Sequence, residues 1–181
     1  MPTAKVNDFK RYLNGKTPSE LKAELVFLFK TFKNVKEYYS SRLQPAAEGK
    51  ILEYYKNAIQ KEFEIRSSGR VSLRFSVMRK AIAEFQKISQ NPQNVAELMM
   101  TVVEEGIGFS LSLGGISEGF CNSLGLMFRK VVDYMHANNL ENALQERCQE
   151  AVEASQDIGW GFGDEIAEIY ASVFPSPPDT E

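Results

Sequence analysis

The fold class follows from residues 17–36, TPSELKAELVFLFKTFKNVK, in which large apolar side chains recur at alternating steps of four and three. The members of this stripe are Leu21, Leu25, Leu28, Phe32 and Val35. This spacing places them on one face of an α-helix, because 3.6 residues complete a turn. Thr17 before Pro18 is typical of a helix start, with Glu20 completing a capping box. The segment therefore predicts one long amphipathic helix.

The same helical period continues in both directions along the chain. Upstream, Phe9, Tyr12 and Leu13 suit a short helix that ends at Asn14-Gly15. Further helical stripes begin at Pro45, near Phe75, at Pro92 and after a turn at Gly114-Gly115, and two more cover residues 140–155 and 162–173. Proline favours the first position of a helix, where its missing N–H costs no hydrogen bond.

No stretch alternates as a β-strand between hairpin turns; residues 71–77 are the one candidate, and they merge with a helical pattern. We therefore predict an all-α fold of seven or eight antiparallel helices. These helices form either a compact bundle or a short α-α superhelix of the HEAT or tetratricopeptide kind. Without a clean repeat period, the bundle is preferred. Residues 1–174 are expected to be one domain, followed by a Pro-rich acidic tail at 175–181.

Composition indicates a globular protein, with 43% hydrophobic and 25% charged residues. The first residues lack the basic tip and apolar run of a secretory signal. The longest uncharged apolar stretch, 106–117, is too short to span a membrane. Two cysteines spaced 27 residues apart exclude a disulfide scaffold. These features predict a cytoplasmic location.

Charge is distributed unevenly, although the net charge is only -3. Residues 1–90 hold 18 Lys/Arg against 9 Asp/Glu, whereas residues 91–181 hold 3 against 15. The first half is therefore basic and the second half is acidic.

Five motifs resemble an uncharacterised bacterial helical family that is known as a domain of unknown function. They are Phe9-Lys10-Arg11-Tyr12-Leu13, Val35-Lys36-Glu37-Tyr38-Tyr39, the run from Phe75 to Phe85, Ala154-Ser155 and Gly159-Trp160-Gly161-Phe162-Gly163-Asp164. The resemblance spans most of the chain. It implies an all-helical cytoplasmic bacterial protein and assigns no activity or catalytic residue.

A basic stretch surrounds the loop before the helix at residue 75. Its candidate anion-binding or partner-binding residues are Arg66, Arg70, Arg74, Arg79 and Lys80, with Lys61 nearby. Arginine binds phosphate through two parallel hydrogen bonds, and a helix N-terminus adds partial positive charge. The alternative is a solvated loop, or arginines that pair with acidic groups. A sequence pI near 5.4 disfavours binding to duplex DNA.

The segment Gly159-Trp160-Gly161-Phe162-Gly163 alternates glycine with large aromatic residues. Glycine destabilises a helix, so another requirement must favour it here. One interpretation is a tight junction in which Trp160 and Phe162 fill the core. The other is a ligand that lies against the bare backbone beneath the Trp160 ring.

Catalytic and metal sites are not expected. A metal could be held by the carboxylates Glu153, Asp157, Asp164 and Glu168, but such a run is more often a hydrated helix face. His136, near a helix end, suits an interaction with the helix dipole. Cys121 and Cys148 lack the basic surroundings of an activated thiolate. We therefore expect no cofactor, no metal and no enzymatic site.

Three functions follow in order of preference. The first is an interaction or scaffold module that binds a protein partner or itself through surfaces of opposite charge. The second is an anion or nucleic-acid binder that uses the Arg66–Lys80 stretch. The third is a metal-dependent enzyme that uses carboxylates.

Overall fold

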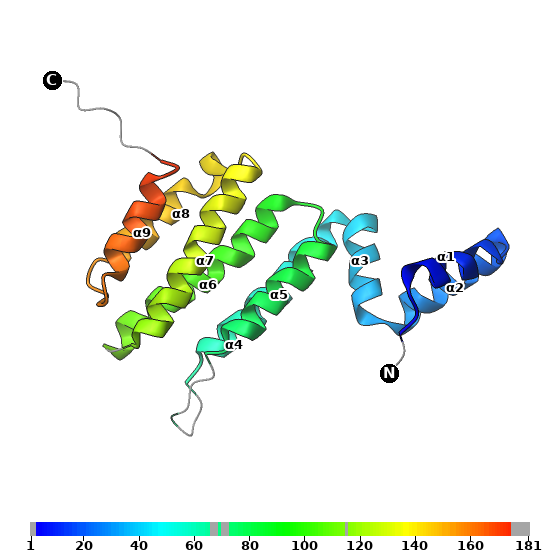
Figure 1. Cartoon of the computed structure of the whole chain (residues 1–181), viewed down its shortest axis with the longest axis horizontal. Coiled ribbons are helices and arrows are strands. Elements are labelled where there is room, and N and C mark those ends of the chain that lie inside the picture. Colours follow the sequence, from blue (N-terminus) through cyan, green and yellow to red (C-terminus); the bar gives the residue numbers. More distant parts are fainter. Residues whose placement is uncertain (1–2, 66–68, 70–72, 115, 175–181) are drawn as a thin grey trace.

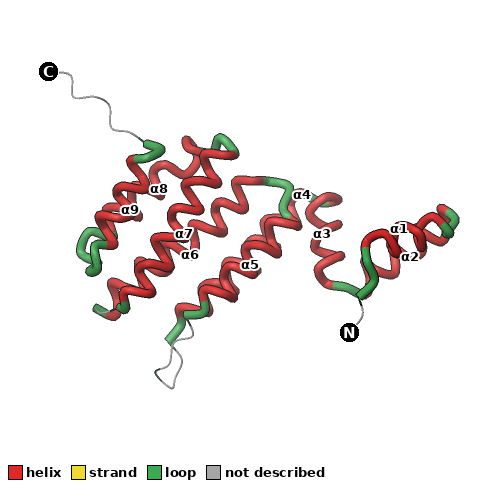
Figure 2. Tube along the Cα trace, in the orientation of Figure 1, coloured by secondary structure: helices red, strands yellow, loops and turns green. Residues whose placement is uncertain are grey.

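The computed structural model describes residues 3–65, 69, 73–114 and 116–174, and these residues form helices and loops without a strand (Figure 2). The helices are α1 (Val6–Asn14), α2 (Pro18–Thr31), α3 (Lys33–Leu43), α4 (Pro45–Phe63), α5 (Phe75–Ile88), α6 (Pro92–Leu113), α7 (Glu118–Ala137), α8 (Glu141–Ala154) and α9 (Phe162–Ala171). The predicted all-α class is confirmed. The predicted tail at 175–181 lies outside the described residues.

Several predicted helix boundaries are confirmed because they depend on local chemistry. Thr17 accepts a hydrogen bond from the Glu20 N–H, and Glu20 reaches back to the Thr17 N–H, which completes the capping box. Pro45 and Pro92 each occupy the first turn of a helix. Gly114 ends α6 with a positive φ of 65°, a conformation that glycine adopts without steric cost.

The prediction of a single helix over residues 17–36 is wrong. The chain breaks at Phe32, whose extended backbone separates α2 from α3, and this break takes the number of described helices to nine. The break lets α3 pack against α4 and α5. Ser41 of α3 donates a buried 2.8 Å hydrogen bond to the carbonyl of Ile88 at the end of α5. This tertiary contact therefore overrides the continuous apolar stripe.

The hairpins α4/α5, α6/α7 and α8/α9 lie side by side in two layers (Figure 1). Helices α4, α6 and α8 form one layer, in which α6 contacts both neighbours. Helices α5, α7 and α9 form the other layer. Within it α7 packs against α9, but α5 and α7 do not pack closely. Helices α1 and α2 project from one end, and neither contains a buried residue.

The core is centred on α6, which contacts α4, α5, α7 and α8. Twelve of its 22 residues are buried, more than in any other described helix. Gly106 brings α7 close, because a Cβ there would lie 2.6 Å from Leu124 Cδ1. Helix α6 therefore joins the two layers.

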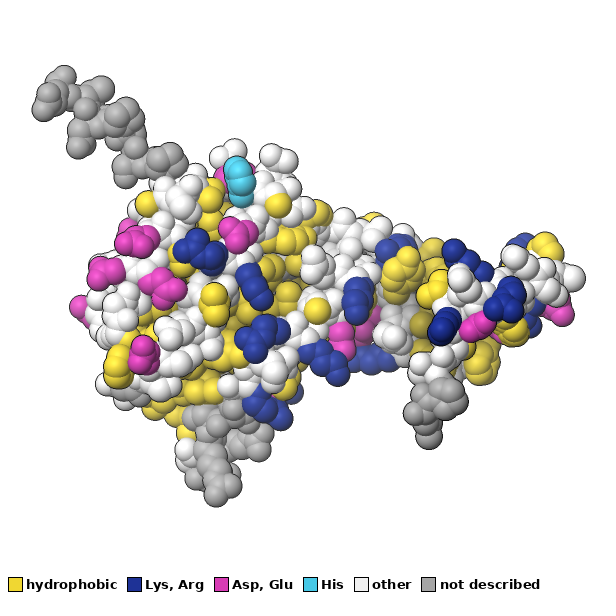
Figure 3. Space-filling model, viewed as in Figure 1, with side chains coloured by type: hydrophobic (Ala, Val, Ile, Leu, Met, Phe, Trp, Pro, Cys, Tyr) yellow, Lys and Arg dark blue, Asp and Glu magenta, His cyan; other side chains and the backbone are white. Residues whose placement is uncertain are grey.

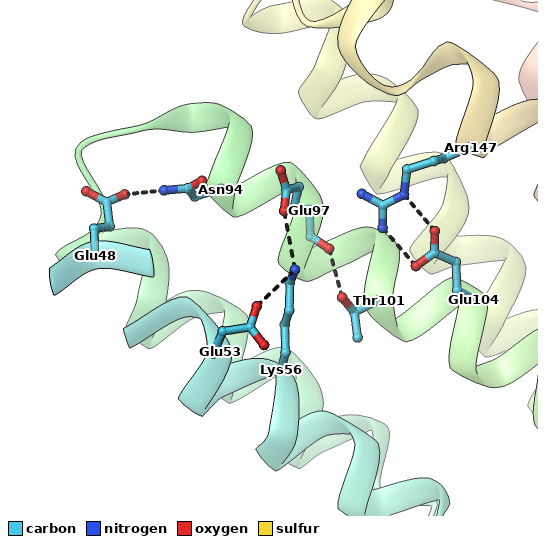
Figure 4. A network of polar contacts seen from close by, with 8 residues as sticks. All are labelled: Glu48, Glu53, Lys56, Asn94, Glu97, Thr101, Glu104 and Arg147. Atoms are coloured by element: carbon cyan, nitrogen blue, oxygen red, sulfur yellow. Dashed lines mark hydrogen bonds and ion pairs between the residues drawn. The ribbon is translucent and has the colours of Figure 1, made fainter. Parts of the chain in front are cut away.

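Polar contacts along one edge of α6 connect it to α4 and α8 (Figure 4). Lys56 of α4 lies 3.3 Å from Glu97. Arg147 of α8 forms two 2.8 Å hydrogen bonds with Glu104. The second contact has the bidentate geometry that makes arginine–carboxylate pairs specific. These contacts fix the order α4, α6, α8 in their layer.

Glu48 is a buried carboxylate at the corner between α4 and the start of α6. It accepts hydrogen bonds from Ser89 Oγ at 2.5 Å, Asn94 Nδ2 at 2.9 Å, and the backbone N–H groups of Gln90 and Asn91. Burial raises the pKa of Glu48, but these hydrogen bonds together outweigh it and hold the pKa below its ordinary value. The carboxylate therefore replaces water as the acceptor for residues 89–94, at the junction between α5 and α6.

Replacing this acceptor should destabilise the fold at neutral pH. We expect Glu48→Gln to lower the free energy of unfolding by about 1–3 kcal/mol, because buried donors lose a charged partner. Chemical denaturation at pH 7 measures this change. Glu53→Gln, at an exposed carboxylate on the same helix, is the control and should change stability by less than about 1 kcal/mol.

The pKa of Glu48 also predicts a pH dependence. Because the folded-state pKa is depressed, the stabilisation is present above the unfolded-state pKa of about 4.3 and is lost as pH falls through the folded-state value. As pH is lowered from 6, the free energy of unfolding should decrease less in Glu48→Gln than in wild type. Equal decreases in the two proteins would contradict this assignment.

Candidate functional site

A groove lies between α2, α3, α4 and α5, at the end of the molecule where the basic N-terminal helices project. Its cavity volume is about 980 Å³. We call it the tyrosine groove. The residues that define it are Leu25, Lys33, Glu37, Tyr38, Tyr39, Tyr54, Tyr55, Val77, Lys80, Glu84 and Lys87. This volume is near the upper end of the range of about 300–1,000 Å³ for pockets that bury most of a ligand.

Two pairs of consecutive tyrosines line the groove. Successive residues on a helix point about 100° apart, so the two members of each pair are buried to different extents. Tyr55 is buried and its ring centroid lies 5.4 Å from that of Phe85. Tyr54 is exposed, and so is Tyr38 of the other pair. The groove therefore offers aromatic surface supported by the core.

Charged side chains surround this aromatic surface. Lys33 Nζ lies 3.6 Å from the centre of the Tyr54 ring and 3.4 Å from Glu37. Contact with Tyr54, followed by the charge of Glu37, raises the pKa of Lys33 more than burial lowers it. Burial, with Glu37 nearby, raises the pKa of Tyr55. The groove thus combines aromatic rings with the ammonium group of Lys33, which remains charged at neutral pH.

The predicted basic stretch does not form one site among the described residues. Arg74 is bound by buried Glu62 through hydrogen bonds of 2.9 Å and 2.7 Å. Arg79 and Lys80 lie on different sides of α5, and Lys80 reaches the tyrosine groove. Arg66 and Arg70 lie outside the described residues. Anion or nucleic-acid binding through this stretch stays a prediction.

Arg79 lines a second, smaller cavity of about 440 Å³ where α5 and α7 separate. Met99 of α6 and Met127 of α7 contribute apolar lining, and both are buried. Lys130 faces this cavity from α7, together with Asp133. The mixed charges of its walls give it no clear preference for an anion.

The segment from Gly159 to Gly163 connects α8 and α9 and divides its two aromatic side chains between core and solvent. Phe162 is buried as predicted, whereas Trp160 is 65% exposed, so the prediction that Trp160 fills the core is wrong. Its Nε1–H donates a 2.8 Å hydrogen bond to the carbonyl of Ile116. A cavity of about 420 Å³ lies beside Trp160, and Gly159 contributes to its wall.

A tight junction exists at Gly163. A Cβ there would lie 3.0 Å from the Ser155 carbonyl oxygen and 3.1 Å from Gln156 Cα. Gly161 has a φ of 69°, which favours glycine. At Gly159 a Cβ would meet nothing within 4 Å. Close packing thus explains one of the three glycines, Gly163, whereas the positive φ explains Gly161, where a Cβ would meet nothing within 4 Å.

The carboxylates considered as metal ligands do not cluster. Within the ranges that the structure describes, no group of three or more His, Cys, Asp or Glu side chains is placed to hold a metal ion. Glu153, Asp157, Asp164 and Glu168 belong to these ranges. His136 Nδ1 lies 2.9 Å from Glu141 Oε1 on the surface.

Both cysteines are buried and free. Burial raises the pKa of the Cys148 thiol to about 12 and also raises that of Cys121. A thiol with such a pKa is almost entirely protonated at neutral pH, and only the thiolate is nucleophilic.

Sequence reasoning missed the tyrosine groove as a site. The sequence feature that could have indicated it is the occurrence of two pairs of consecutive tyrosines, at 38–39 and at 54–55. Adjacent aromatics on an amphipathic helix cannot both face the same core, which indicates that the members of each pair differ in exposure. The signal does not reveal that the two pairs meet, because α3 and α4 come together only in the tertiary structure.

The fold and groove define an all-helical protein built of successive antiparallel hairpins, with an apolar groove open at its basic end. None of its described helices is both long and apolar enough to cross a membrane. Residues 4–173 match the model of a family of unknown function, DUF6155, and the chain belongs to this family. No curated protein and no solved structure matches the chain. The predicted relationship to a domain of unknown function is confirmed.

Gly163 and Gly159 provide a matched pair of substitutions. We expect Gly163→Ala to lower the free energy of unfolding by about 1–3 kcal/mol, because the methyl group must displace backbone atoms of the preceding turn. Gly159→Ala should have a smaller effect. Thermal or chemical denaturation of both variants checks this, and equal stability of the two would contradict the close approach.

The cysteine environment predicts slow thiol chemistry. At pH 8, roughly 1 in 10⁴ Cys148 thiols is ionised for a pKa of about 12. Labelling with a chromogenic disulfide reagent should therefore be slow in the folded protein and rapid after denaturation. Labelling of the folded protein at the rate of a free thiol would contradict the burial of both cysteines.

Proposed function

We propose that this protein is an interaction module, a helical scaffold that binds a protein partner or another copy of itself through surfaces of opposite charge. The observation that carries the proposal is the separation of charge along the long axis. Residues 3–44, at the end with α1–α3, hold nine Lys/Arg and four Asp/Glu. Residues 138–174, at the α8–α9 end, hold one Arg and eight Asp/Glu.

The surface view supports this separation. On the face in Figure 3, acidic side chains gather mainly over the α8–α9 end, and basic side chains gather over the middle and the N-terminal helices. Among the described residues, the Lys56–Glu97 contact is the one ion pair that joins residues 1–90 with residues 91–181. Opposite potentials that are not neutralised internally steer association between molecules.

Exposed apolar surface at the basic end also supports binding. Helices α1 and α2 bury none of their residues. The exposed large apolar side chains of this end include Val6, Phe9, Tyr12, Leu25, Val26, Phe27 and Phe32. Such a concentration of exposed apolar side chains at one end supports an interaction site, since large exposed apolar patches are typical of such sites.

Salt dependence is the first test. Association of wild type, measured by sedimentation velocity, should be stronger at about 20 mM than at about 500 mM salt, because screening shortens the range of surface charges. Retention of a protein partner on the immobilised wild-type protein should likewise be stronger at the lower of these two salt concentrations. Association that is equal at both salt concentrations, or absent at both, would contradict the proposal.

Charge reversal at the acidic end is the second arm of this test. Glu146→Lys with Glu150→Lys changes exposed side chains of α8 and should weaken low-salt association by about tenfold or more. The matched control is Glu53→Lys with Glu64→Lys, which alters net charge equally but lies in the basic half. The control should not weaken association. An equal decrease in the association of both variants would show that association depends on net charge and not on the separation of charge between the two ends.

A further inference from the structure

We infer that successive copies of this protein bind head to tail, with the surface around Trp160 of one copy inserted into the tyrosine groove of the next. This inference rests on the proposed interaction function and names its partner and surfaces. We call the inserted surface the Trp160 end; it consists of Leu111, Ile116, Asp157 and Trp160.

The backbone holds Trp160 in solvent at a steric cost. Its φ of 66° lies in the left-handed region, which residues with a side chain rarely adopt, and Gly161 follows with a φ of 69°. The hydrogen bond from Nε1 to Ile116 fixes the direction of the indole. A strained and oriented aromatic side chain that contributes no core packing points to a role in binding.

The surroundings of Trp160 have the composition of an interface centre. Leu111 is exposed beside it, and Leu113 is exposed at the end of the same helix. Asp157 lies in the same cavity wall and makes no hydrogen bond or ion pair among the described residues. Tryptophan is enriched among the residues that dominate binding energies, particularly when it enters a pocket.

The tyrosine groove is complementary to this surface. Tyr38 and Tyr54 are exposed, although Arg42 and Lys33 lie over their rings at 3.4 Å and 3.6 Å from the ring centres, and the ring surface that these cations leave open pairs favourably with an indole. Lys87 forms no ion pair among the described residues, and Lys80 has a weak one, 3.8 Å from Glu84. These ammonium groups suit an acidic partner and also stack favourably over an indole.

The other exposed apolar surface fits the groove less well. Helices α1 and α2 carry Lys10, Arg11, Lys22 and Lys30 against Asp8, Glu20 and Glu24, so they bring a small excess of positive charge toward the lysines of the groove. Like charges brought together oppose binding. The acidic Trp160 end, by contrast, brings opposite charges together, so charge complementarity selects it as the occupant.

The positions of the two surfaces define the type of assembly. The tyrosine groove lies toward the N-terminal helices, whereas the α6–α7 turn and the α8–α9 loop lie toward the other end of the molecule (Figure 1). One molecule cannot close such a contact on itself. A contact between different surfaces leaves a free groove and a free Trp160 end in each dimer, so copies add in series.

The experiment uses two full-length variants, each altered at one surface. Trp160→Ala removes the anchor and leaves the groove intact. Lys80→Glu with Lys87→Glu alters the groove and leaves the anchor intact. Each variant alone should self-associate at least about tenfold more weakly than wild type in sedimentation at low salt. Mixing them should restore one contact, producing a 1:1 complex that grows no further.

The chain contains a single tryptophan, so its fluorescence reports directly on the anchor. Emission should shift to shorter wavelength as wild type is concentrated at low salt, because the exposed indole becomes buried. Trp160→Phe should retain more association than Trp160→Ala. Circular dichroism of each variant checks that the helical fold is unchanged.

Leu126→Ser is the matched control, since Leu126 of α7 is 61% exposed, Trp160 is 65% exposed, and Leu126 lines neither surface. This variant should associate as wild type does. Salt-dependent association that survives Trp160→Ala, or that Leu126→Ser weakens as much, would overturn the head-to-tail contact while keeping the proposed interaction function. A mixture of Trp160→Ala with the Lys80→Glu/Lys87→Glu variant that stays monomeric would also overturn the contact. An absence of any salt-dependent association would contradict both the contact and the proposed interaction function.

Discussion

The burial of α6 is the constraint on which the remaining structure depends. A helix that is apolar around most of its circumference is stable only when other helices cover it, and α4, α5, α7 and α8 do so. The uncovered edge of α6 carries its carboxylates, which contact Lys56, Gln60 and Arg147 of the flanking helices. One helix thus determines the hydrophobic core and the polar contacts that order the layer around it.

The same arrangement explains why the two charged halves stay apart. Each hairpin packs mainly on the hairpin next to it in sequence, so position along the chain becomes position along the molecule. A fold that interleaved its first and last helices would have brought lysines against the acidic helices and neutralised both. Here Lys56 and Glu97 meet where the halves adjoin, and most other charges remain at their own end. Polarity in the sequence therefore becomes polarity of the surface.

The junction between α8 and α9 shows how a short segment serves both core and surface. Phe162 and Gly163 turn inward, where the glycine allows the preceding turn to approach. Trp160 turns outward under a positive φ and is held by Ile116. Alternating glycines permit this reversal within five residues, because they accept backbone conformations that other residues avoid. The exposed indole and the tyrosine groove lie at opposite ends of the molecule.

The sequence by itself determined the helices whose limits depend on neighbouring residues. The Thr17 capping box, the prolines at 45 and 92 and the positive φ of Gly114 act within one helical turn, so they can be identified from local sequence. Tertiary structure alone decided the break at Phe32, the pairing of Arg74 with Glu62 and the meeting of the tyrosine pairs. The hydrogen bond from Ser41 to Ile88 spans 47 residues, and no periodicity encodes it. Such features depend on which distant surfaces come together. The favoured packing is the one that buries most apolar area over the whole chain, and no single segment determines it.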